Sequence, residues 1–311
     1  MPVTQPTVSV IIPTRNRTDW LKESIQSVLD QSFRDFEIIV VDDCSTDDTR
    51  IVVEELQDGR IRYIRHDTKM GGAAARNTGI KASRAEYIAF LDDDDIWPPR
   101  KLELQIMKFE ELPDDFGIVY GGFEFFSREN GLILDTIRPQ IRGLTRREML
   151  KGCFFSIITA LVRKRCFTKA GVFDENLTSC QDWEMWIRIT RDFKVDFVPE
   201  TLARVAVHGG QITADLKAKI SGRRALLEKH SEEIRREPRI HGEHLQRLGV
   251  LTALDDDLPR AKEYFRKSSK ACPTRKGPYL HLLISILAPR YYRQLLERRG
   301  TDNLGGISFY Y

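Results

Sequence analysis

Four consecutive aspartates, Asp92 to Asp95, follow a short apolar stretch at residues 87–91 and precede Ile-Trp-Pro-Pro. The apolar residues predict a strand buried on both faces, so the carboxylates leave a parallel sheet at its carboxyl edge, where ligands bind. Adjacent carboxylates repel one another, and a divalent cation relieves this while sharing its other positions with phosphate oxygens. Because a core strand and a Trp-Pro-Pro segment flank the run, we favour a metal–diphosphate site over a solvated charge run.

Two further loops of the first hundred residues carry residues suited to a nucleotide. Asp42-Asp43 ends a predicted strand at residues 37–41 and has the charge to bind a base or ribose edge. The competing interpretation is helix capping, for which Ser45 or Asp47 also serves. Gly71-Gly72 opens a helix whose backbone N–H groups, with Arg76, suit phosphate, although close helix packing explains the small residues equally well. It is not a Walker loop, because no Gly-Lys-Ser/Thr follows.

The elements that position these loops alternate strand and helix. Strands are predicted at residues 8–12, 37–41, 61–64 and 87–91, with intervening helices, the first capped by Asp19. This order indicates βαβ units and a mainly parallel sheet. Helices at 100–111 and 181–192 and strands at 117–126, 156–162, 195–198 and 202–207 follow, with an irregular stretch between residues 126 and 156. The prediction is an α/β catalytic domain over residues 1–215.

The remaining residues, 216–311, predict only helices, at 217–234, 241–254, 259–271 and 278–299, the last interrupted at Pro289. The middle pair is spaced loosely like one tetratricopeptide unit, which must pack on something else. This region holds 20 Lys and Arg against 11 Asp and Glu, a balance of +9, so the rest carries −6 of the overall +3. The acidic part, residues 1–215, and the basic tail, residues 216–311, are therefore expected to contact different partners.

Composition excludes several other classes. The 311 residues are 41% hydrophobic and 31% charged, as in a globular protein. Five scattered cysteines form neither a disulfide framework nor a zinc motif. No signal peptide and no run of about 18 apolar residues is present, so a reduced, cytoplasmic setting is expected. No nucleic-acid-binding module accompanies the basic residues, so nucleic acid is not expected as a partner.

Several ordered motifs resemble family 2 glycosyltransferases of the GT-A fold. They are VSVIIPTRNR from Val8, VDDCSTDDT from Val41, GGAAARNTG from Gly71 and FLDDDD from Phe90, with QDW from Gln181 and RVAVH from Arg204 as later motifs. The resemblance spans residues 8–213. It implies a GT-A domain and an inverting glycosyltransferase of the hexosyltransferase type, taking sugar from a nucleotide-sugar, UDP-linked, to a glycan or lipid-linked acceptor in surface polysaccharide biosynthesis.

The same resemblance implies roles for individual residues. Asp182 corresponds to the catalytic base, and Asp92 and Asp94 form the Asp-x-Asp signature that works through Mn²⁺ or Mg²⁺. Pro13 and Arg15 are implied to border the nucleotide pocket, and Asp43 to bind the uracil side of the donor. Asp93 is implied to lie near the ribose or sugar, and His208 near the diphosphate. Two positions depart from the family pattern. Gln181 stands where Glu is usual, which reduces the charge beside the base, and Ala203 stands where Tyr is frequent.

The chemistry of these residue types agrees with the resemblance. A sugar hydroxyl becomes a good nucleophile when a carboxylate accepts its proton, and a metal stabilises the leaving diphosphate. For Asp182 the alternative is a helix cap. A nucleotidyltransferase would need a basic residue on a triphosphate and leave Asp182 without a role. The other alternative is a catalytically weak sugar-nucleotide binder or scaffold that acts through its helical tail.

Three further features have structural alternatives. His241 and His244 lie three residues apart, but no third metal ligand is near, so we interpret both as solvated. Trp183 and Trp186 have rings suited to stacking on a sugar, but one of them is expected in the core. In the tail, apolar residues at 280–287 precede Tyr and Arg residues, a composition that suits contact with an anionic membrane on its cytoplasmic face. For residues 280–287 the alternative is a helix packed on the catalytic domain.

Overall fold

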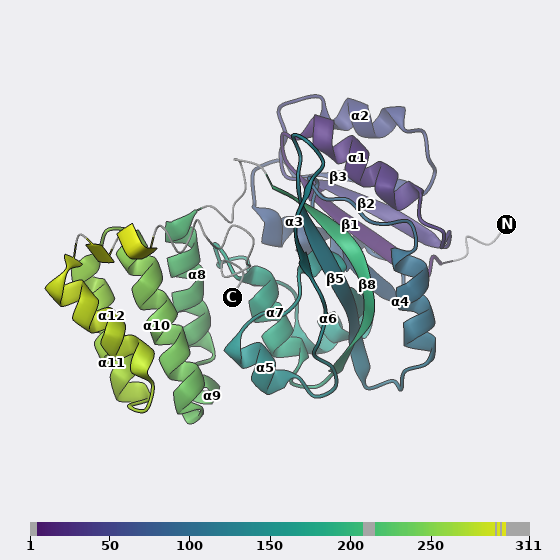
Figure 1. The fold of residues 1–311 in the computed structure, drawn as a ribbon. Coiled ribbons are helices and arrows are strands. Elements are labelled where there is room, and N and C mark those ends of the chain that lie inside the picture. Colours follow the sequence, from purple (N-terminus) through teal and green to yellow (C-terminus); the bar gives the residue numbers. More distant parts are fainter. Residues whose placement is uncertain (1–4, 208–214, 290, 293, 297–311) are drawn as a thin grey trace. The chain divides into compact units, whose positions relative to one another are not determined.

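The computed structural model describes residues 5–207, 215–289, 291–292 and 294–296 (Figure 1). The chain divides into two compact units. The first comprises residues 1–146, 154–175 and 184–208, and the second comprises 147–153, 176–183 and 209–311. The C-terminal helices therefore share a unit with two short segments from the middle of the chain. The predicted domain boundary after residue 215 stays a prediction.

An eight-stranded mixed sheet forms the centre of the first unit. Its path is β3-β2-β1-β4-β7-β5-β6, and β8 pairs with β5. The first four strands are parallel to one another, β8 is parallel to β5, and β6 and β7 run antiparallel to their neighbours. The strands are β1 (Val8–Thr14), β2 (Phe36–Asp42), β3 (Ile61–Arg65), β4 (Tyr87–Phe90), β5 (Phe116–Ser127), β6 (Ile133–Ile137), β7 (Leu161–Arg163) and β8 (Lys194–Val207). The predicted mixed, mainly parallel α/β sheet is confirmed.

Helices cover this sheet. Helix α3 (Gly72–Ala82) packs on β1 and β2, α1 (Thr18–Leu29) contacts β1 and α2 (Thr49–Glu55), and α4 (Lys101–Glu110) contacts β5 and β8 (Figure 1). A Cβ on Gly79 would lie 2.4 Å from the Ile11 side chain, so only glycine lets α3 approach β1 this closely. Close helix packing therefore accounts for at least this glycine of the Gly71–Gly79 motif.

The sequence predicts a strand at residues 156–162, but side chains rather than a neighbouring strand donate hydrogen bonds to backbone carbonyls in the first part of this segment. Residues Ile157–Thr159 form a 3₁₀ turn, and β7 covers only Leu161–Arg163. Trp97 Nε1 donates to the Ile158 carbonyl, and Gln105 Nε2 donates to the Thr159 carbonyl. Because side chains take these carbonyls, the strand does not extend back over residues 156–160, where the prediction is wrong; it is confirmed for Leu161 and Val162.

Other bounds also differ from those predicted. Helix α1 begins at Thr18, so Asp19 lies in its first turn and is not its cap. The strand β6 was missed because its apolar residues are largely exposed at a sheet edge, and the short helices α5 (Arg146–Lys151) and α6 (Lys164–Ala170) were also missed. Strands predicted at 195–198 and 202–207 form the single strand β8. Helix α7 (Gln181–Ile189) is shorter than predicted.

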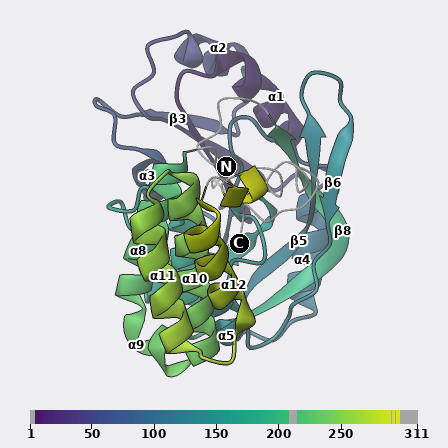
Figure 2. The same cartoon turned by 60° about the vertical axis from the view of Figure 1, so that its left-hand side comes forward.

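The second unit contains the C-terminal helices (Figures 1 and 2): α8 (Leu216–Lys229), α9 (Ser231–Arg236), α10 (Pro238–Leu254), α11 (Leu258–Ala271) and α12 (Lys276–Leu287). The predicted helix pair, α10 and α11, is confirmed. The two helices approach closely at Gly249, where an added Cβ atom would lie 2.4 Å from the Phe265 side chain. The pair packs against α8 and α12. The single helix predicted over 217–234 is wrong, because it breaks at His230. No helix among the described residues is long and apolar enough to span a membrane.

Candidate active site

The acidic run is held at the carboxyl edge of the sheet by groups from β1 and the loop after it. Asp93 Oδ2 accepts a hydrogen bond from Thr14 Oγ1 at 2.8 Å. Arg17 Nη1 lies 3.0 Å from Asp93 Oδ1 and 2.7 Å from Asp94 Oδ2. Burial raises the pKa of Asp93 to about 6, the Arg17 charge opposes this, and the neighbouring Asp94 adds to it. One arginine thus offsets part of the repulsion within the run.

A second guanidinium meets the first aspartate of the run. Arg76, on α3, donates from Nη2 to Asp92 Oδ1 at 2.6 Å. Its Nε atom is buried, and no acceptor among the described residues reaches it. A buried N–H without an acceptor is costly, so this atom indicates an acceptor that the described protein atoms do not supply. A phosphate oxygen is suited to that role, since guanidinium groups bind phosphate through several N–H donors.

The last aspartate of the run has a structural function. Asp95 is buried, and its Oδ1 accepts from the Ala206 N–H of β8 at 3.0 Å. Its carbonyl accepts from Ser24 Oγ of α1 at 2.7 Å. Burial and the charges of Asp94 and Asp92 raise its pKa well above the usual value. Asp95 therefore ties the run to two other elements rather than to a ligand.

Asp43, at the end of β2, is held by three donors. His66 Nδ1 lies 2.9 Å from Oδ1, the Met70 N–H donates to Oδ1 at 2.7 Å, and the Gly71 N–H donates to Oδ2 at 2.8 Å. Although burial acts to raise it, these hydrogen bonds keep the pKa of Asp43 below its usual value. His66 Nε2 lies 2.9 Å from Thr78 Oγ1, which fixes the ring. Asp43 is thus an ionised carboxylate of fixed orientation.

Two predicted donor-contact residues lie at the end of β1. Pro13 is half-buried within the strand, opposite Val41 of β2. Arg15 has an exposed side chain, and its backbone N–H faces Asp93 Oδ2 at 3.4 Å. The structure therefore brings Pro13, Arg15, Asp43, Arg76 and the acidic run to the ends of β1, β2 and β4, which are adjacent and parallel.

Two predicted site residues remain. His208 is outside the described residues. Asp182 belongs to the second unit, together with residues 176–183, and is the second residue of α7. The helix bounds thus place it within the first turn rather than at the capping position. The interpretation of His244 as solvated is wrong: it is buried and stacked on Trp183, and Trp183 and Trp186 are both buried.

The donor set of the acidic run suits a hard divalent cation. Asp92 and Asp94 offer carboxylate oxygens, which Mn²⁺ and Mg²⁺ bind together with substrate phosphates. No cluster of three or more His, Cys, Asp or Glu ligands occurs in the described part of the chain. The residues therefore fit a cation that takes its other ligands from a bound diphosphate and water, rather than a cage made by protein alone.

Sequence reasoning missed three residues of this site: Thr14, Arg17 and His66. Each directly contacts a predicted site residue. His66 follows β3 as Asp43 follows β2, so the strand-end rule could have identified it. Arg17 sits in the same loop as Arg15, but which arginine turns toward the run depends on the backbone, where Asn16 has a φ of 53°.

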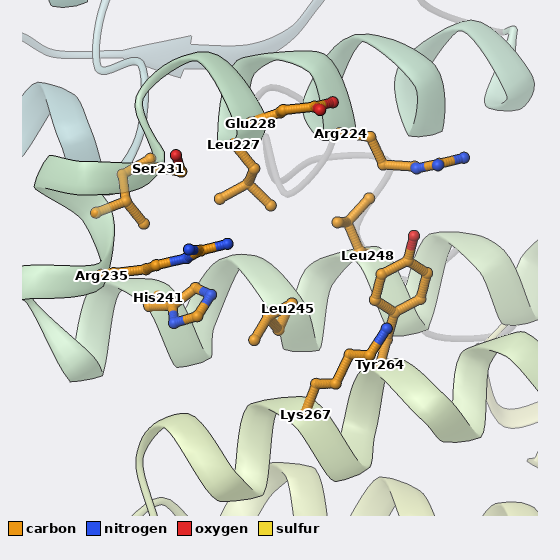
Figure 3. A pocket seen from close by; sticks show the side chains of 11 residues that line it. Arg224, Leu227, Glu228, Ser231, Arg235, His241, Leu245, Leu248, Tyr264 and Lys267 are labelled. Carbon is orange, nitrogen blue, oxygen red and sulfur yellow. The ribbon is translucent and has the colours of Figure 1, made fainter.

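The second unit has a groove of its own, of about 390 Å³ (Figure 3). Leucines form its floor, and the exposed cations Arg224, Arg235 and Lys267 stand at its edges. Among the described residues that line the groove, Glu228 is the one carboxylate. The three cations outnumber it, so the net charge of the groove favours anions. None of the predicted site residues that the structure describes lines this groove.

The chain matches known glycosyltransferases along most of its first two thirds. The model of glycosyl transferase family 2 matches residues 9–171. UDP-Glc:alpha-D-GlcNAc-diphosphoundecaprenol beta-1,3-glucosyltransferase WfgD of Escherichia coli is 33% identical over 191 residues, 61% of this chain and 72% of that protein. An uncharacterized glycosyltransferase of Rickettsia felis is 35% identical over 211 residues. The match spans 66% of this chain but only 34% of the Rickettsia felis protein.

Solved structures share the fold at lower identity. TarS 1–349 of S. aureus, in complex with UDP-GlcNAc, has a TM-score of 0.68 at 17% identity and covers 96% of this chain and 92% of its own. The mannosyltransferase PcManGT of Pyrobaculum calidifontis, in complex with GDP-Man and Mn²⁺, has a TM-score of 0.58 at 20% identity. The match covers 97% of this chain and 86% of PcManGT. The GT-A architecture is thereby confirmed. With more than half of its length matched by the family model, the chain belongs to glycosyltransferase family 2.

Proposed function

We propose that this glycosyltransferase is inverting and depends on Mn²⁺ or Mg²⁺, and that it transfers sugar from a UDP-sugar to a lipid-linked or glycan acceptor of surface polysaccharide. The observation that carries the proposal is the joining of three strand ends into one acidic, arginine-bordered site. Its buried Arg76 Nε has no acceptor among the described residues. Such a site suits an anion brought with a cation, which is the form of a nucleoside diphosphate.

Within this proposal each group of the chain has a task. Asp43 presents an ionised carboxylate to the base, and Asp93 lies toward the ribose or sugar beside Pro13 and Arg15. Arg76 donates to a phosphate oxygen. A cation held by Asp92 and Asp94 would offset the charge that develops on the leaving diphosphate. His208 is proposed near the diphosphate on the family resemblance alone.

Transfer itself requires a base. Asp182 accepts the proton of the acceptor hydroxyl as that oxygen attacks the anomeric carbon and the bond to the diphosphate breaks. One displacement with one base inverts the anomeric centre. The lipid-linked acceptor is supported by the name of the WfgD relative, and UDP by WfgD and by the TarS complex. The GDP-Man complex of PcManGT shows that the fold also serves another nucleotide.

A donor screen by thermal unfolding tests the nucleotide. With Mn²⁺ present, a UDP-sugar at 100 times its Kd should raise the unfolding free energy by about 2.7 kcal/mol, because it binds only the native state. The melting temperature should rise accordingly, and much less with EDTA. The matched control is the same sugar on GDP. Protection by GDP-sugars with none by UDP-sugars would overturn the UDP assignment.

We further propose that α12 contacts an anionic membrane. Leu282 and Ile284 pack on the α10–α11 core, whereas Leu280, Leu283 and Leu287 are 55%, 54% and 73% exposed. Their spacing of three and four residues places them on one face of the helix. The following residues of the sequence include Arg290, Arg293, Arg298 and Arg299. An apolar face followed in the sequence by arginines suits the interface of an anionic bilayer, which also holds lipid-linked acceptors.

Replacing both Leu283 and Leu287 by Gln should weaken binding to vesicles containing phosphatidylglycerol about 10-fold or more, because each leucine loses roughly 1.5–3 kcal/mol of burial. The matched control replaces Ile51 and Met107, which are 54% and 52% exposed on the other unit. Vesicle co-sedimentation measures both. Point variants are preferable to removing the tail, because Tyr292 and Leu296 belong to the core. Equal binding by both double variants would refute the membrane contact.

A further inference from the structure

The segment that carries Asp182 is packed within the C-terminal helical unit. Residues 176–183 and 147–153 cluster with residues 209–311 rather than with the sheet. Cys180, two residues before Asp182, has a φ of 60°, in the left-handed region. Non-glycine residues hold this conformation only where their surroundings fix it. The contacts of the segment with α8 and α10 therefore help to fix the direction of Asp182.

Gly222 on α8 allows the closest of these contacts. A Cβ at this position would lie 2.5 Å from the Ser179 carbonyl oxygen and 2.8 Å from its carbon. Inside a helix, glycine is about 0.5–1 kcal/mol less favourable than alanine. An alanine would improve the helix but would push the backbone of the segment away. The glycine thus matches the approach of α8 to Ser179.

Trp183, the residue after Asp182, is fixed on three sides. Its Nε1 donates to the Met149 carbonyl at 2.7 Å. The His244 ring stacks on it, with centroids 5.5 Å apart and planes 23° apart, and the Arg223 guanidinium lies 4.9 Å from its ring centroid. Trp183 is 2% exposed. The ring, and with it the peptide that joins Trp183 to Asp182, has little freedom to move.

Arg223 and His244 are themselves joined. His244 Nε2 lies 2.8 Å from the Leu150 carbonyl, which only accepts, so Nε2 carries the hydrogen. Burial and the Arg223 charge lower the pKa of His244 to about 3, so the ring is neutral at pH 7 and Nδ1 accepts from Arg223 Nη1 at 3.3 Å. Burial lowers the pKa of Arg223 to about 10, which leaves it charged. The result is a buried cation that contacts both the Trp183 ring and His244.

We propose that Gly222, Arg223 and His244 are positioning residues that hold Asp182 in its catalytic orientation through Ser179 and Trp183. The C-terminal helices are then part of the catalytic apparatus. This inference rests on the proposed role of Asp182 as base. It explains why a buried arginine and an interior glycine adjoin on α8, where an apolar residue and an alanine would suit an ordinary helix better.

Adjacent arginines on α8 provide a matched test. Arg223→Met removes the cation from the Trp183 ring, whereas Arg224→Met changes an exposed side chain at the groove. We expect Arg223→Met to lower kcat for transfer about 10- to 100-fold, the scale on which small displacements of a catalytic group act. The KM for the donor should stay within twofold. Arg224→Met should behave as the unmodified enzyme, and Arg223→Lys should recover part of kcat because it keeps a cation over the ring.

Gly222→Ala provides a second variant that leaves every charge in place. It should lower kcat with donor KM unchanged, while circular dichroism shows the helices intact, so a folding defect in Arg223→Met leaves the inference testable. If Gly222→Ala, and Arg223→Met where that variant folds, transfer at the normal rate while Asp182→Asn is impaired, the positioning is refuted and the proposed function stands. If Asp182→Asn transfers normally, it is the proposed base that fails.

Discussion

Asp182→Asn should lower turnover by roughly 10²- to 10⁴-fold, the usual range for loss of a general base, with fold and UDP-sugar affinity unchanged. Asparagine has nearly the same shape and keeps polar atoms in the first turn of α7, but it cannot take a proton from the acceptor hydroxyl. Transfer rates with saturating donor, together with calorimetric donor affinity, measure the two quantities separately. A fall in rate without a fall in affinity assigns Asp182 to chemistry.

The control is Asp19→Asn. Asp19 is the second residue of α1, as Asp182 is of α7, so both substitutions remove the same charge from the same position of a helix. Asp19 is exposed and should tolerate the change with an unaltered rate. A near-normal rate for Asp182→Asn would remove it from the mechanism. The absence of transfer in the unmodified protein, with donor still bound, would instead favour the scaffold alternative.

Asp94→Asn should abolish the part of UDP affinity that depends on Mn²⁺, a loss of about 10-fold or more, while affinity in EDTA stays nearly unchanged. The carboxylate acts through the cation, so without metal there is little for the substitution to remove. The substitution also leaves Arg17 with Asp93 as its remaining partner in the run, which should lower the pKa of Asp93 toward its usual value. Calorimetric titration of UDP with and without Mn²⁺ measures the difference.

Asp95→Asn is the informative comparison within the same run. Asparagine keeps an oxygen that accepts from the Ala206 N–H, and burial with the charges of Asp94 and Asp92 already disfavours the ionised form of Asp95, so the substitution should preserve both the fold and the metal dependence of UDP binding. If the unmodified protein binds UDP equally well with and without Mn²⁺, the metal assignment is wrong. If Asp95→Asn rather than Asp94→Asn removes the dependence, the assignment of ligands within the run is wrong.

The loops of the site could be predicted because their signals are local. A buried strand followed at once by aspartates specifies its own geometry, and adjacent parallel strands bring such ends together whatever their separation along the chain. Asp43, Arg76 and the acidic run therefore lie where the strand pattern puts them. The orientation of Arg17 and the three hydrogen bonds to Asp43 depend on backbone turns. The hydrophobic periodicity of the sequence does not predict these turns.

Tertiary contacts account for the errors. Residues 157–159 have strand composition, but Trp97 and Gln105 take the carbonyls that a ladder would use. His244 follows a polar stretch and looks solvated, yet Trp183, 61 positions earlier, covers it. The packing of residues 176–183 with the C-terminal helices is of the same kind. In each case the structure depends on a contact with a residue far away in the sequence. Secondary-structure propensity and hydrophobic periodicity describe only neighbouring residues, so they cannot predict such a contact.

The bonds that hold the acidic run also have a consequence for how the chain is made. Thr14 precedes Asp93 by 79 residues, whereas the Ala206 donor to Asp95 follows 111 residues later. At about 5–20 residues per second, β8 leaves the ribosome roughly 5–20 s after the run itself. Until then the crowded carboxylates lack one of their ties, and the sheet lacks the strand that pairs along β5. Ligand-binding capacity should therefore be acquired late, after synthesis of the first unit is complete, so an abandoned nascent chain would not sequester the nucleotide.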